Sequence, residues 1–537
     1  MLGMMMNEPL LISSILRYGE NYYSDTEIVS QTVEGSTHRY TYRDLAKRSR
    51  QLAKALEKIG LSHGERVGTL AWNGYRHLEL YYGVSGAGFV CHTINPRLFP
   101  TQIAYIIAHA NDSVLFCDLT FFPLLEALAS QLAHLKAIVV MTDAAHMPNS
   151  KTLPNLLCYE TLLEVESDDY EWPIFDENTA SGLCYTSGTT GKPKGVLYSH
   201  RSSVLHAMGI NIHDALALSA TDVIVPIVPM FHVNAWGLPY SSIMVGAKIV
   251  MAGPHHDGAS LYTLFENEGV TAAAGVPTIW LGLLDWMREN NKQFSSLNRI
   301  IIGGSAVPPI MIEQFFKLGV DVKQAWGMTE TSPAGLATNF LPVHQKLMPK
   351  ERLSLIAKQG RPLFGIEFRI LDTHNNPVAR DGKSFGSMWV RGAWVASGYY
   401  NDEPHSAFTD DGWFNTGDVV TMDENGFVQI VDRDKDIVKS GGEWISSIEL
   451  ENIAQSHPAI KEAAVVAKPD KRWGERPILV VQLHAESQFS HEDMIALYQD
   501  KIPKWSLPDK VITVDALPHT ATGKLLKTAI REIVLKE

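Results

Sequence analysis

Hydroxyl residues, glycines and lysines gather in one short stretch, YTSGTTGKPKG at 185–195, directly behind an apolar run. Bare backbone N–H groups, hydroxyl donors and a lysine charge are the features of a phosphate-binding loop. The common form of that loop, G-x-x-x-x-G-K-[ST], is not matched, because Thr186 stands in place of the first glycine and Pro193 follows Lys192. The stretch taken alone therefore predicts either a different phosphate loop or an ordinary surface turn.

The composition is that of a globular protein with more than one core. A chain of 537 residues predicts at least two domains. The net charge of −13 argues against general nucleic-acid binding, which needs a basic face. The four cysteines lack metal-site spacing, and we expect reduced, mostly buried thiols in a cytoplasmic protein. We interpret the N-terminus as part of the fold, and no window reaches the ~18 apolar residues of a membrane span.

Helix-like and strand-like patterns alternate through most of the chain. Residues 40–60 carry leucines on one helical face, and Thr41 with Asp44 forms a helix start signal. Strand-like runs such as RVGTLAW at 66–72 and RIIIGG at 299–304 lie between predicted helices. This alternation predicts an α/β fold with parallel sheets. After about residue 365, closely spaced strands predict a β-rich subdomain.

The predicted domain boundaries depend on DRDKDIVKSGGEW at 432–444, which combines charges with two adjacent glycines. We expect a large N-terminal domain at 1–431, a hinge at 432–439 and a small mobile α+β domain at 440–537. In the small domain, Ser446 and Glu449 predict a capping box, and 522–535 a last helix.

Four further stretches bear on the first loop: QAWGMTETSP at 324–333, DGWFNTGDVV at 411–420, DRDKDIVKSGGEWI at 432–445 and TATGKLLK at 520–527. In order and spacing, the five stretches together resemble the AMP-forming adenylate enzymes, which include acyl-CoA synthetases, luciferases and peptide-synthetase adenylation domains. MFHVNAWGLP at 230–239 and KSGGEWISSIELEN at 439–452 are most similar to fatty-acyl-CoA synthetases and to ligases of 3-methylmercaptopropionate. The resemblance covers nearly the whole chain and identifies 185–195 as the phosphate loop of that family.

The resemblance implies that a carboxylate attacks the α-phosphate of ATP. Mg²⁺, backbone N–H groups and lysines would offset the repulsion between these two anions. Thr329 and Glu330 match the family's Thr-Glu pair, whose threonine binds the α-phosphate and whose glutamate holds the metal together with a hydroxyl such as that of Thr186. The residues that match the phosphate loop are Thr186, Ser187, Gly188, Thr189, Thr190, Gly191 and Lys194.

The nucleoside is expected to lie against a second group of residues. Asp418 matches the carboxylate that takes both ribose hydroxyls, and Arg433 is expected to support the ribose or a phosphate from the next strand. The alternatives are a turn aspartate and a surface ion pair. The residues that match the adenine wall are Gly304, Gln324, Ala325 and Trp326. The family usually has tyrosine where Trp326 stands; tryptophan keeps a flat stacking face, and a role in the core is its alternative.

Lysines near the C-terminus are predicted to act in catalysis and in domain movement. Lys524 matches the catalytic lysine that bridges the substrate carboxylate and the α-phosphate, whereas we expect Lys527 to be a solvated helix residue. Lys435 matches the hinge residue between domains. Lys439 and Trp444 match positions that close over the nucleotide in long-chain synthetases.

The acyl group is expected to bind near His232 and Trp236, the tryptophan matching a gate to the acyl tunnel; a structural role in the core is the alternative. Small residues at 303–305 predict an open wall that suits either a long tunnel or a short thioether acid. The members of this predicted wall are Gly303, Gly304 and Ser305.

The resemblance predicts an AMP-forming ligase that joins a medium- to long-chain fatty acid to CoA through an acyl-adenylate, using ATP and Mg²⁺. The alternatives are a ligase of 3-methylmercaptopropionate or another short acid, an adenylate-forming enzyme that does not use CoA, and a catalytically silent nucleotide-binding protein. A homodimer and a peripheral membrane contact are compatible with the resemblance, and no nucleic-acid partner is expected.

Overall fold

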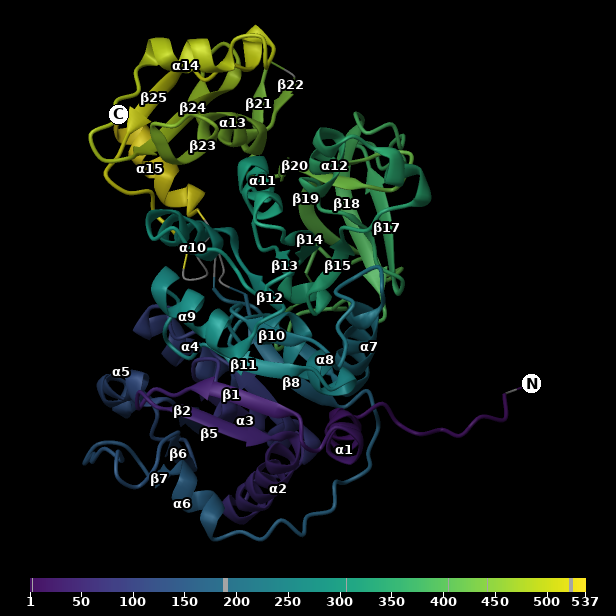
Figure 1. Cartoon of the computed structure of the whole chain (residues 1–537), viewed down its shortest axis with the longest axis vertical. Coiled ribbons are helices and arrows are strands. Elements are labelled where there is room, and N and C mark those ends of the chain that lie inside the picture. The colour runs from purple at the N-terminus through teal and green to yellow at the C-terminus, as the bar shows by residue number, and fades with distance from the viewer. Residues whose placement is uncertain (2, 187–191, 306, 404, 442, 521–524) are drawn as a thin grey trace.

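The computed structural model describes every residue except 2, 187–191, 306, 404, 442 and 521–524. The described residues form a large N-terminal part with two sheets of mainly parallel strands, an antiparallel β-subdomain, and a small α+β C-terminal part at one end of the molecule (Figure 1). The predicted fold class is confirmed.

Two sheets build the N-terminal part, and their central strands are short apolar runs buried on both faces because helices cover both sides. The first sheet contains, in spatial order, β7 (Leu156–Cys158), β6 (Ala137–Val140), β5 (Asp112–Cys117), β3 (Arg66–Leu70), β4 (Val90–Thr93), β8 (Ala180–Tyr185) and β9 (Gly195–Ser199). The second contains β16 (Arg361–Pro362), β15 (Ala334–Ala337), β14 (Asp321–Gly327), β13 (Arg299–Ile302), β12 (Ala272–Gly275), β10 (Val223–Pro226), β11 (Lys248–Met251), β1 (Glu27–Gln31) and β2 (Thr37–Thr41).

Helices cover these sheets and begin where local signals allow. At the start of the second helix, the Thr41 hydroxyl accepts the Asp44 N–H, and the Asp44 carboxylate accepts the Thr41 N–H over 2.9 Å. The predicted start signal is thereby confirmed as a capping box. The helices of this part are α1 (Ile12–Tyr22), α2 (Tyr42–Ile59), α3 (Tyr75–Gly86), α4 (Pro100–Ala110), α5 (Phe122–Ala127), α6 (Tyr159–Glu164), α7 (His200–Asn211), α8 (Leu238–Val245), α9 (Gly258–Glu268), α10 (Pro277–Glu289), α11 (Pro309–Lys317) and α12 (Pro349–Ile356).

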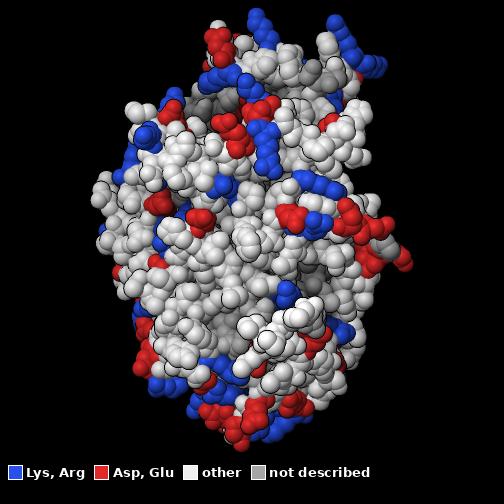
Figure 2. Space-filling model, turned by 90° about the vertical axis from the view of Figure 1, so that its right-hand side faces the viewer, with Lys and Arg blue, Asp and Glu red and all other residues white. Residues whose placement is uncertain are grey.

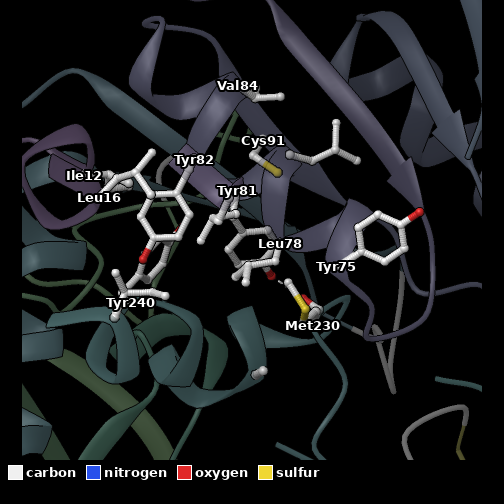
Figure 3. Packing of buried hydrophobic residues seen from close by; sticks show 14 of the residues in the cluster. Ile12, Leu16, Tyr75, Leu78, Tyr81, Tyr82, Val84, Cys91, Met230 and Tyr240 are labelled. Atoms are coloured by element: carbon white, nitrogen blue, oxygen red, sulfur yellow. Dashed lines mark hydrogen bonds between the residues drawn. The ribbon is translucent and has the colours of Figure 1, made fainter. Parts of the chain in front are cut away.

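A buried cluster of tyrosines and aliphatic side chains joins α1, α3 and α8 (Figure 3). Tyr81 and Tyr82 of α3 pack near Tyr240 of α8, with ring centroids 5.6 and 5.9 Å from the Tyr240 ring. The Tyr81 hydroxyl donates to the Met230 carbonyl over 2.5 Å, so its polar end is satisfied inside the core. This bond fixes the start of the stretch 230–239 in which His232 and Trp236 lie.

The β-subdomain is a four-stranded antiparallel sheet of β17 (Ile366–Leu371), β18 (Phe385–Gly392), β19 (Phe414–Met422) and β20 (Val428–Arg433). The strands predicted after residue 365 are therefore present. The C-terminal part has the strands β22 (Glu443–Ile445), β21 (Val438–Ser440), β24 (Gly474–Leu483), β23 (Ile460–Asp470) and β25 (Lys510–Thr513), with the helices α13 (Ser447–Gln455), α14 (His491–Tyr498) and α15 (Lys527–Lys536).

Two local predictions for the C-terminal part are refined. The Ser446 hydroxyl caps α13 by accepting the Glu449 N–H over 3.0 Å, as expected for the first half of the predicted box. The last helix was predicted at 522–535, but α15 begins at Lys527, and Leu525 and Leu526 directly before it are not helical.

The cysteines and the surface agree with the compositional expectations. All four cysteines are unpaired, and three of them are buried. Acidic and basic side chains are interspersed on the face drawn in Figure 2, so this face offers no wide basic surface. Among the described residues, every helix is too short or too polar to cross a lipid bilayer.

Candidate active site

A cavity of about 680 Å³ lies where the N-terminal part, the β-subdomain and the C-terminal part meet. The parallel strands β13 and β14 end at it, as expected for an α/β sheet, whose ligands bind beyond the carboxyl ends of the strands. The predicted site residues that line it are Thr186, Lys194, His232, Trp236, Gly303, Gly304, Ala325, Trp326, Thr329, Glu330, Arg433 and Lys435.

Other predicted residues lie away from the cavity lining or cannot be placed. Gln324 is buried in β14 and Ser305 is exposed. Lys439 and Trp444 face each other across β21 and β22, and the Trp444 ring stacks on Phe385 of β18 at 5.2 Å. Six further predicted site residues lie outside the described residues: Ser187, Gly188, Thr189, Thr190, Gly191 and Lys524.

The predicted phosphate loop leaves an antiparallel hairpin whose two ends are held together. Tyr185 of β8 pairs with Gly195 of β9. Beyond that pair, the Thr186 N–H donates to the Lys194 carbonyl over 2.9 Å, and the Lys194 N–H donates to the Thr186 hydroxyl over 3.4 Å. Thr186 and Lys194 therefore lie next to each other at the wall of the cavity, where Thr186 supplies a hydroxyl and Lys194 a positive charge.

Glu330 is a nearly buried carboxylate at the cavity, 6% exposed. Its Oε1 accepts the Tyr399 hydroxyl over 2.8 Å, and its backbone carbonyl accepts the Ala396 N–H over 2.7 Å. Burial and the Glu330 charge raise the pKa of Tyr399 well above its usual range, so this hydroxyl remains a donor. The Lys194 ammonium lies 4.8 Å from the Tyr399 ring centroid. The tyrosine therefore links two predicted phosphate-site residues.

Tyr399 was missed from the sequence, although the doublet Tyr399-Tyr400 follows a glycine there and both tyrosines line the cavity. The nearby Thr329 is anchored from the other side, because the Tyr198 hydroxyl donates to its carbonyl over 2.8 Å.

The donor set around Glu330 fits Mg²⁺ of the phosphate-bound kind. Among the described residues, no group of three or more His, Cys, Asp or Glu side chains could hold a metal ion. Magnesium is commonly bound by one or two carboxylates together with waters and substrate phosphates. One carboxylate from Glu330 and one hydroxyl from Thr186 at the same cavity meet that requirement.

Asp418 is 1% exposed and lies behind two residues that line the cavity. It stands opposite Arg433 in the β19–β20 register, and the Arg433 Nε is 2.7 Å from its Oδ1. The Trp326 indole Nε1–H donates to its Oδ2 over 2.9 Å. Trp326 is thus a core residue of the β-subdomain cluster and also lines the cavity, while its contact with adenine stays a prediction.

One part of the cavity lining consists of apolar residues from one hydrophobic cluster, and it contains the predicted acyl-site residue Trp236. Trp236 lies in left-handed backbone geometry at φ 57°, and its ring packs on β13. A Cβ added at Gly303 would lie 2.7 Å from the Ala325 carbonyl oxygen and 3.2 Å from Trp236 Cη2, so only glycine fits there. The apolar neighbours missed from the sequence are Ile210, Leu216 and Ile301.

The C-terminal part closes the cavity with Thr520, Leu525 and the first turns of α15. The prediction that Lys527 is solvated was wrong: its side chain is 13% exposed, and its ammonium lies 2.7 Å from Glu451 Oε1. Burial disfavours the charge of Lys527, but the Glu451 and Asp432 carboxylates outweigh burial and raise its pKa. Burial lowers the pKa of Lys435, the predicted hinge residue.

A cavity at the carboxyl ends of parallel strands, lined by a carboxylate and several lysines, is the kind of site at which α/β enzymes bind a charged ligand such as a nucleotide. Residues 17–400 match the family of AMP-binding enzymes, and residues 449–524 match the AMP-binding enzyme C-terminal domain. The chain belongs to this family.

Two relatives match the chain almost end to end. A 3-methylmercaptopropionyl-CoA ligase of Ruegeria lacuscaerulensis is 51% identical, covering 99% of this chain and 98% of its own length. A medium-chain fatty acid–CoA ligase of Ectopseudomonas oleovorans is 49% identical, covering 99% of this chain and 97% of its own. The crystal structure of the anthranilate CoA ligase AuaEII with anthranoyl-AMP shares the fold, with a TM-score of 0.86, 24% identity and 98% of each chain covered. The chain is an AMP-forming acid–CoA ligase.

Proposed function

We propose that this ligase activates an unbranched aliphatic acid, with medium- to long-chain fatty acids as the first candidates. ATP and Mg²⁺ serve the first half-reaction, in which the acid carboxylate displaces pyrophosphate and forms an acyl-adenylate. CoA is the co-substrate of the second, in which its thiol displaces AMP.

The apolar side of the cavity carries this proposal. Ile210, Leu216 and Ile301 belong to one hydrophobic cluster, against which Trp236 packs. The lysines and arginines of the described lining come from other segments, namely the phosphate loop, the end of β20 with the residues that follow it, and α15. An acid with a second charged group would therefore bury that charge without a partner, which is costly. An uncharged aliphatic chain fits this lining.

The predicted phosphate-site residues then help the acid carboxylate to approach the α-phosphate of ATP, although both groups are negatively charged. Glu330 and Thr186 would hold Mg²⁺, which would neutralise charge on the phosphates. Lys194 and the loop 186–194 bind the phosphates, and Thr329 binds the α-phosphate. Lys524 bridges the acid carboxylate and the α-phosphate, so that the developing charge meets a fixed cation.

We assign the nucleoside to residues of the cavity wall and to two buried residues outside the cavity lining, Asp418 and Gln324. Asp418 accepts the ribose hydroxyls, with Arg433 beside it. The adenine stacks against the wall formed by Gly304, Ala325 and Trp326, and Gln324 supports that wall from within β14. Lys439 and Trp444 close over the nucleotide when the C-terminal part moves.

A second candidate substrate is 3-methylmercaptopropionate, because the Ruegeria relative is named for its thioester. A thioether is as apolar as a short alkyl chain. Of the predicted small-residue wall, Gly303 and Gly304 line the cavity, and neither has a side chain that would exclude a sulfur in place of a methylene.

We further infer that residues 1–431 form the adenylation domain, 432–439 the hinge and 440–537 a mobile domain. Two hydrophobic clusters made only of residues from Val438 onward support a separate C-terminal core. Unpaired cysteines support a cytoplasmic location. A homodimer and a peripheral membrane contact remain predictions.

A competition assay tests the proposal. Purified enzyme with ATP, Mg²⁺ and CoA receives pairs of acids from propionate to palmitate, with 3-methylmercaptopropionate included, and each acyl-CoA is quantified by mass spectrometry. The fatty-acid assignment expects the highest kcat/KM between medium and long chains. Preference for 3-methylmercaptopropionate over every fatty acid would select the second candidate, and adenylate without thioester would reject a CoA ligase.

A further inference from the structure

Asp432 is a carboxylate to which the predicted site assigns no role, and it lies between the two parts of the molecule. It belongs to β20, opposite Val419 of β19, and is 1% exposed. It precedes the predicted hinge residue Lys435 by three positions, so it belongs to the N-terminal side of the pivot.

The C-terminal part is docked on this carboxylate. Ser447 is the first residue of α13, and its backbone N–H donates to Asp432 Oδ2 over 2.6 Å. Asp432 Oδ1 accepts the Arg433 N–H over 2.7 Å, which fixes the carboxylate's orientation. The N-terminus of a helix favours a negative charge, because its first N–H groups have no partner within the helix. The N-cap Ser446 also donates its hydroxyl to the Val431 carbonyl.

A buried cation completes the contact. The Lys527 ammonium donates to the Ser447 hydroxyl over 2.5 Å and pairs with Glu451 Oε1 over 2.7 Å. Asp432 and Lys527 also attract each other electrostatically, which supports the charge of Lys527 in spite of its burial. Lys527 begins α15, so the same cluster holds the helix that follows 520–524 against the cavity.

The contacts differ in what a rotation at Lys435 would do to them. Glu451 and Lys527 both lie after the pivot, so their ion pair would move as a unit. The bond from Ser447 to Asp432 and the bond from Ser446 to Val431 cross the pivot and would break. Asp432 therefore stabilises one orientation selectively, namely the orientation in which Thr520 and Leu525 line the cavity.

We propose that Asp432 is a positioning residue for adenylate formation: it docks α13 and Lys527 and so holds the C-terminal part with Thr520 and Leu525 at the reaction cavity. This inference rests on the proposed two-step function. We expect Asp432 to favour adenylate formation over thioester formation, although Asp432 itself contacts neither substrate.

The first variant is Asp432→Asn, which keeps the shape and removes the charge. We expect acid-dependent pyrophosphate release to fall about thirtyfold, because a hydrogen bond from a helix N-terminus to a charged acceptor and an attraction to Lys527 are weakened together. Thioester formation from pre-made acyl-adenylate and CoA should change less than about threefold, because its orientation does not use Asp432. The matched control is Asp410→Asn, an exposed carboxylate outside the hinge and outside the described cavity lining; both rates should stay within twofold of wild type.

A second pair of variants tests the bond without touching Asp432. Ser447→Pro removes the N–H that Asp432 accepts, and proline suits the first position of a helix. Ser446 at φ −70° and ψ 117° already has the extended backbone that a following proline requires. Ser447→Ala removes only the hydroxyl. We expect pyrophosphate release by the proline variant to be about tenfold below that of the alanine variant, with equal thioester formation.

The outcomes are separable. Equal losses in both half-reactions in a variant with a wild-type thermal melt would overturn the positioning role. A loss in Asp410→Asn as large as that in Asp432→Asn would also overturn it. If Asp432→Asn does not fold, the ratio of the pyrophosphate release rates of Ser447→Ala and Ser447→Pro tests the positioning role, and equal rates would contradict it. A wild-type enzyme that fails to release pyrophosphate or to form a thioester would instead contradict the proposed function itself.

Discussion

The indole Nε1–H of Trp326 donates to Asp418 Oδ2 over 2.9 Å, and Arg433 Nε lies 2.7 Å from the other oxygen of the same carboxylate. Trp326 and Arg433 line the cavity, whereas Asp418 lies behind them. The tryptophan at this position, where the family usually has tyrosine, therefore does more than offer a stacking face. It orients the carboxylate that we assign to the ribose.

Trp326→Phe tests this relationship, because phenylalanine keeps an aromatic face and lacks the N–H. We expect the KM for ATP to rise about tenfold, since a hydrogen bond to a buried charged group is lost, while the KM for the acid stays within twofold. Steady-state kinetics with each substrate varied measure both values. Trp505→Phe, at an exposed site away from the described cavity lining, is the control. Equal rises in both KM values would show general damage to the cavity and not loss of orientation.

Lys524→Ala tests the bridging cation. Its own position lies outside the described residues, but Thr520 and Leu525 on either side of it line the cavity. We expect adenylate formation to fall by about two to three orders of magnitude, because an anion–anion encounter loses its fixed positive charge. Thioester formation from pre-made acyl-adenylate should fall less than about tenfold. Lys536→Ala, at the exposed end of α15, should affect neither step. Similar losses in the two assays would reject the assignment.

Glu330→Gln tests the metal site by removing a charge with little change in shape. We expect activity to fall about a hundredfold and the Mg²⁺ concentration for half-maximal rate to rise, because the carboxylate that we assign to the metal is gone. Titration of the rate with MgCl₂ measures the shift. Tyr399→Phe removes the hydroxyl that Glu330 accepts but keeps the charge, so its Mg²⁺ dependence should move far less. A Glu330→Gln enzyme with the wild-type Mg²⁺ curve would show that Glu330 is not a ligand.

Lys435→Pro tests the hinge, because proline fixes φ near −65° at the predicted pivot. We expect pyrophosphate release to stay within about tenfold of wild type, while thioester formation falls roughly a hundredfold, since the second step needs the rotated domain. Lys435→Ala, which keeps the backbone free, should spare the thioester step far more. A circular dichroism melt separates misfolding from gating, and equal damage to both steps in a folded proline variant would remove the hinge from the mechanism.

Much of the fold could be predicted because its signals are local. The cap formed by Thr41 and Asp44, the short apolar strands and the change of pattern after residue 365 each lie within a few residues of one another. The helix–strand alternation leads to parallel sheets because parallel strands need a crossover connection. The phosphate-loop stretch alone left a surface turn as an alternative, and it was identified, like the Thr-Glu pair, through the resemblance of five ordered stretches to a known family.

The tertiary structure alone decided which of these residues meet and which side chains are buried. Tyr399 donates to Glu330 across 69 positions of sequence, and Trp326 to Asp418 across 92, so no local pattern predicts either bond. The local sequence predicts that Lys527 is exposed on its helix. Its burial could not be predicted, because the Glu451 carboxylate that pairs with it comes from α13. Desolvation and charge pairing depend on what packs around a group, and that packing is set by contacts between segments that are distant in the chain.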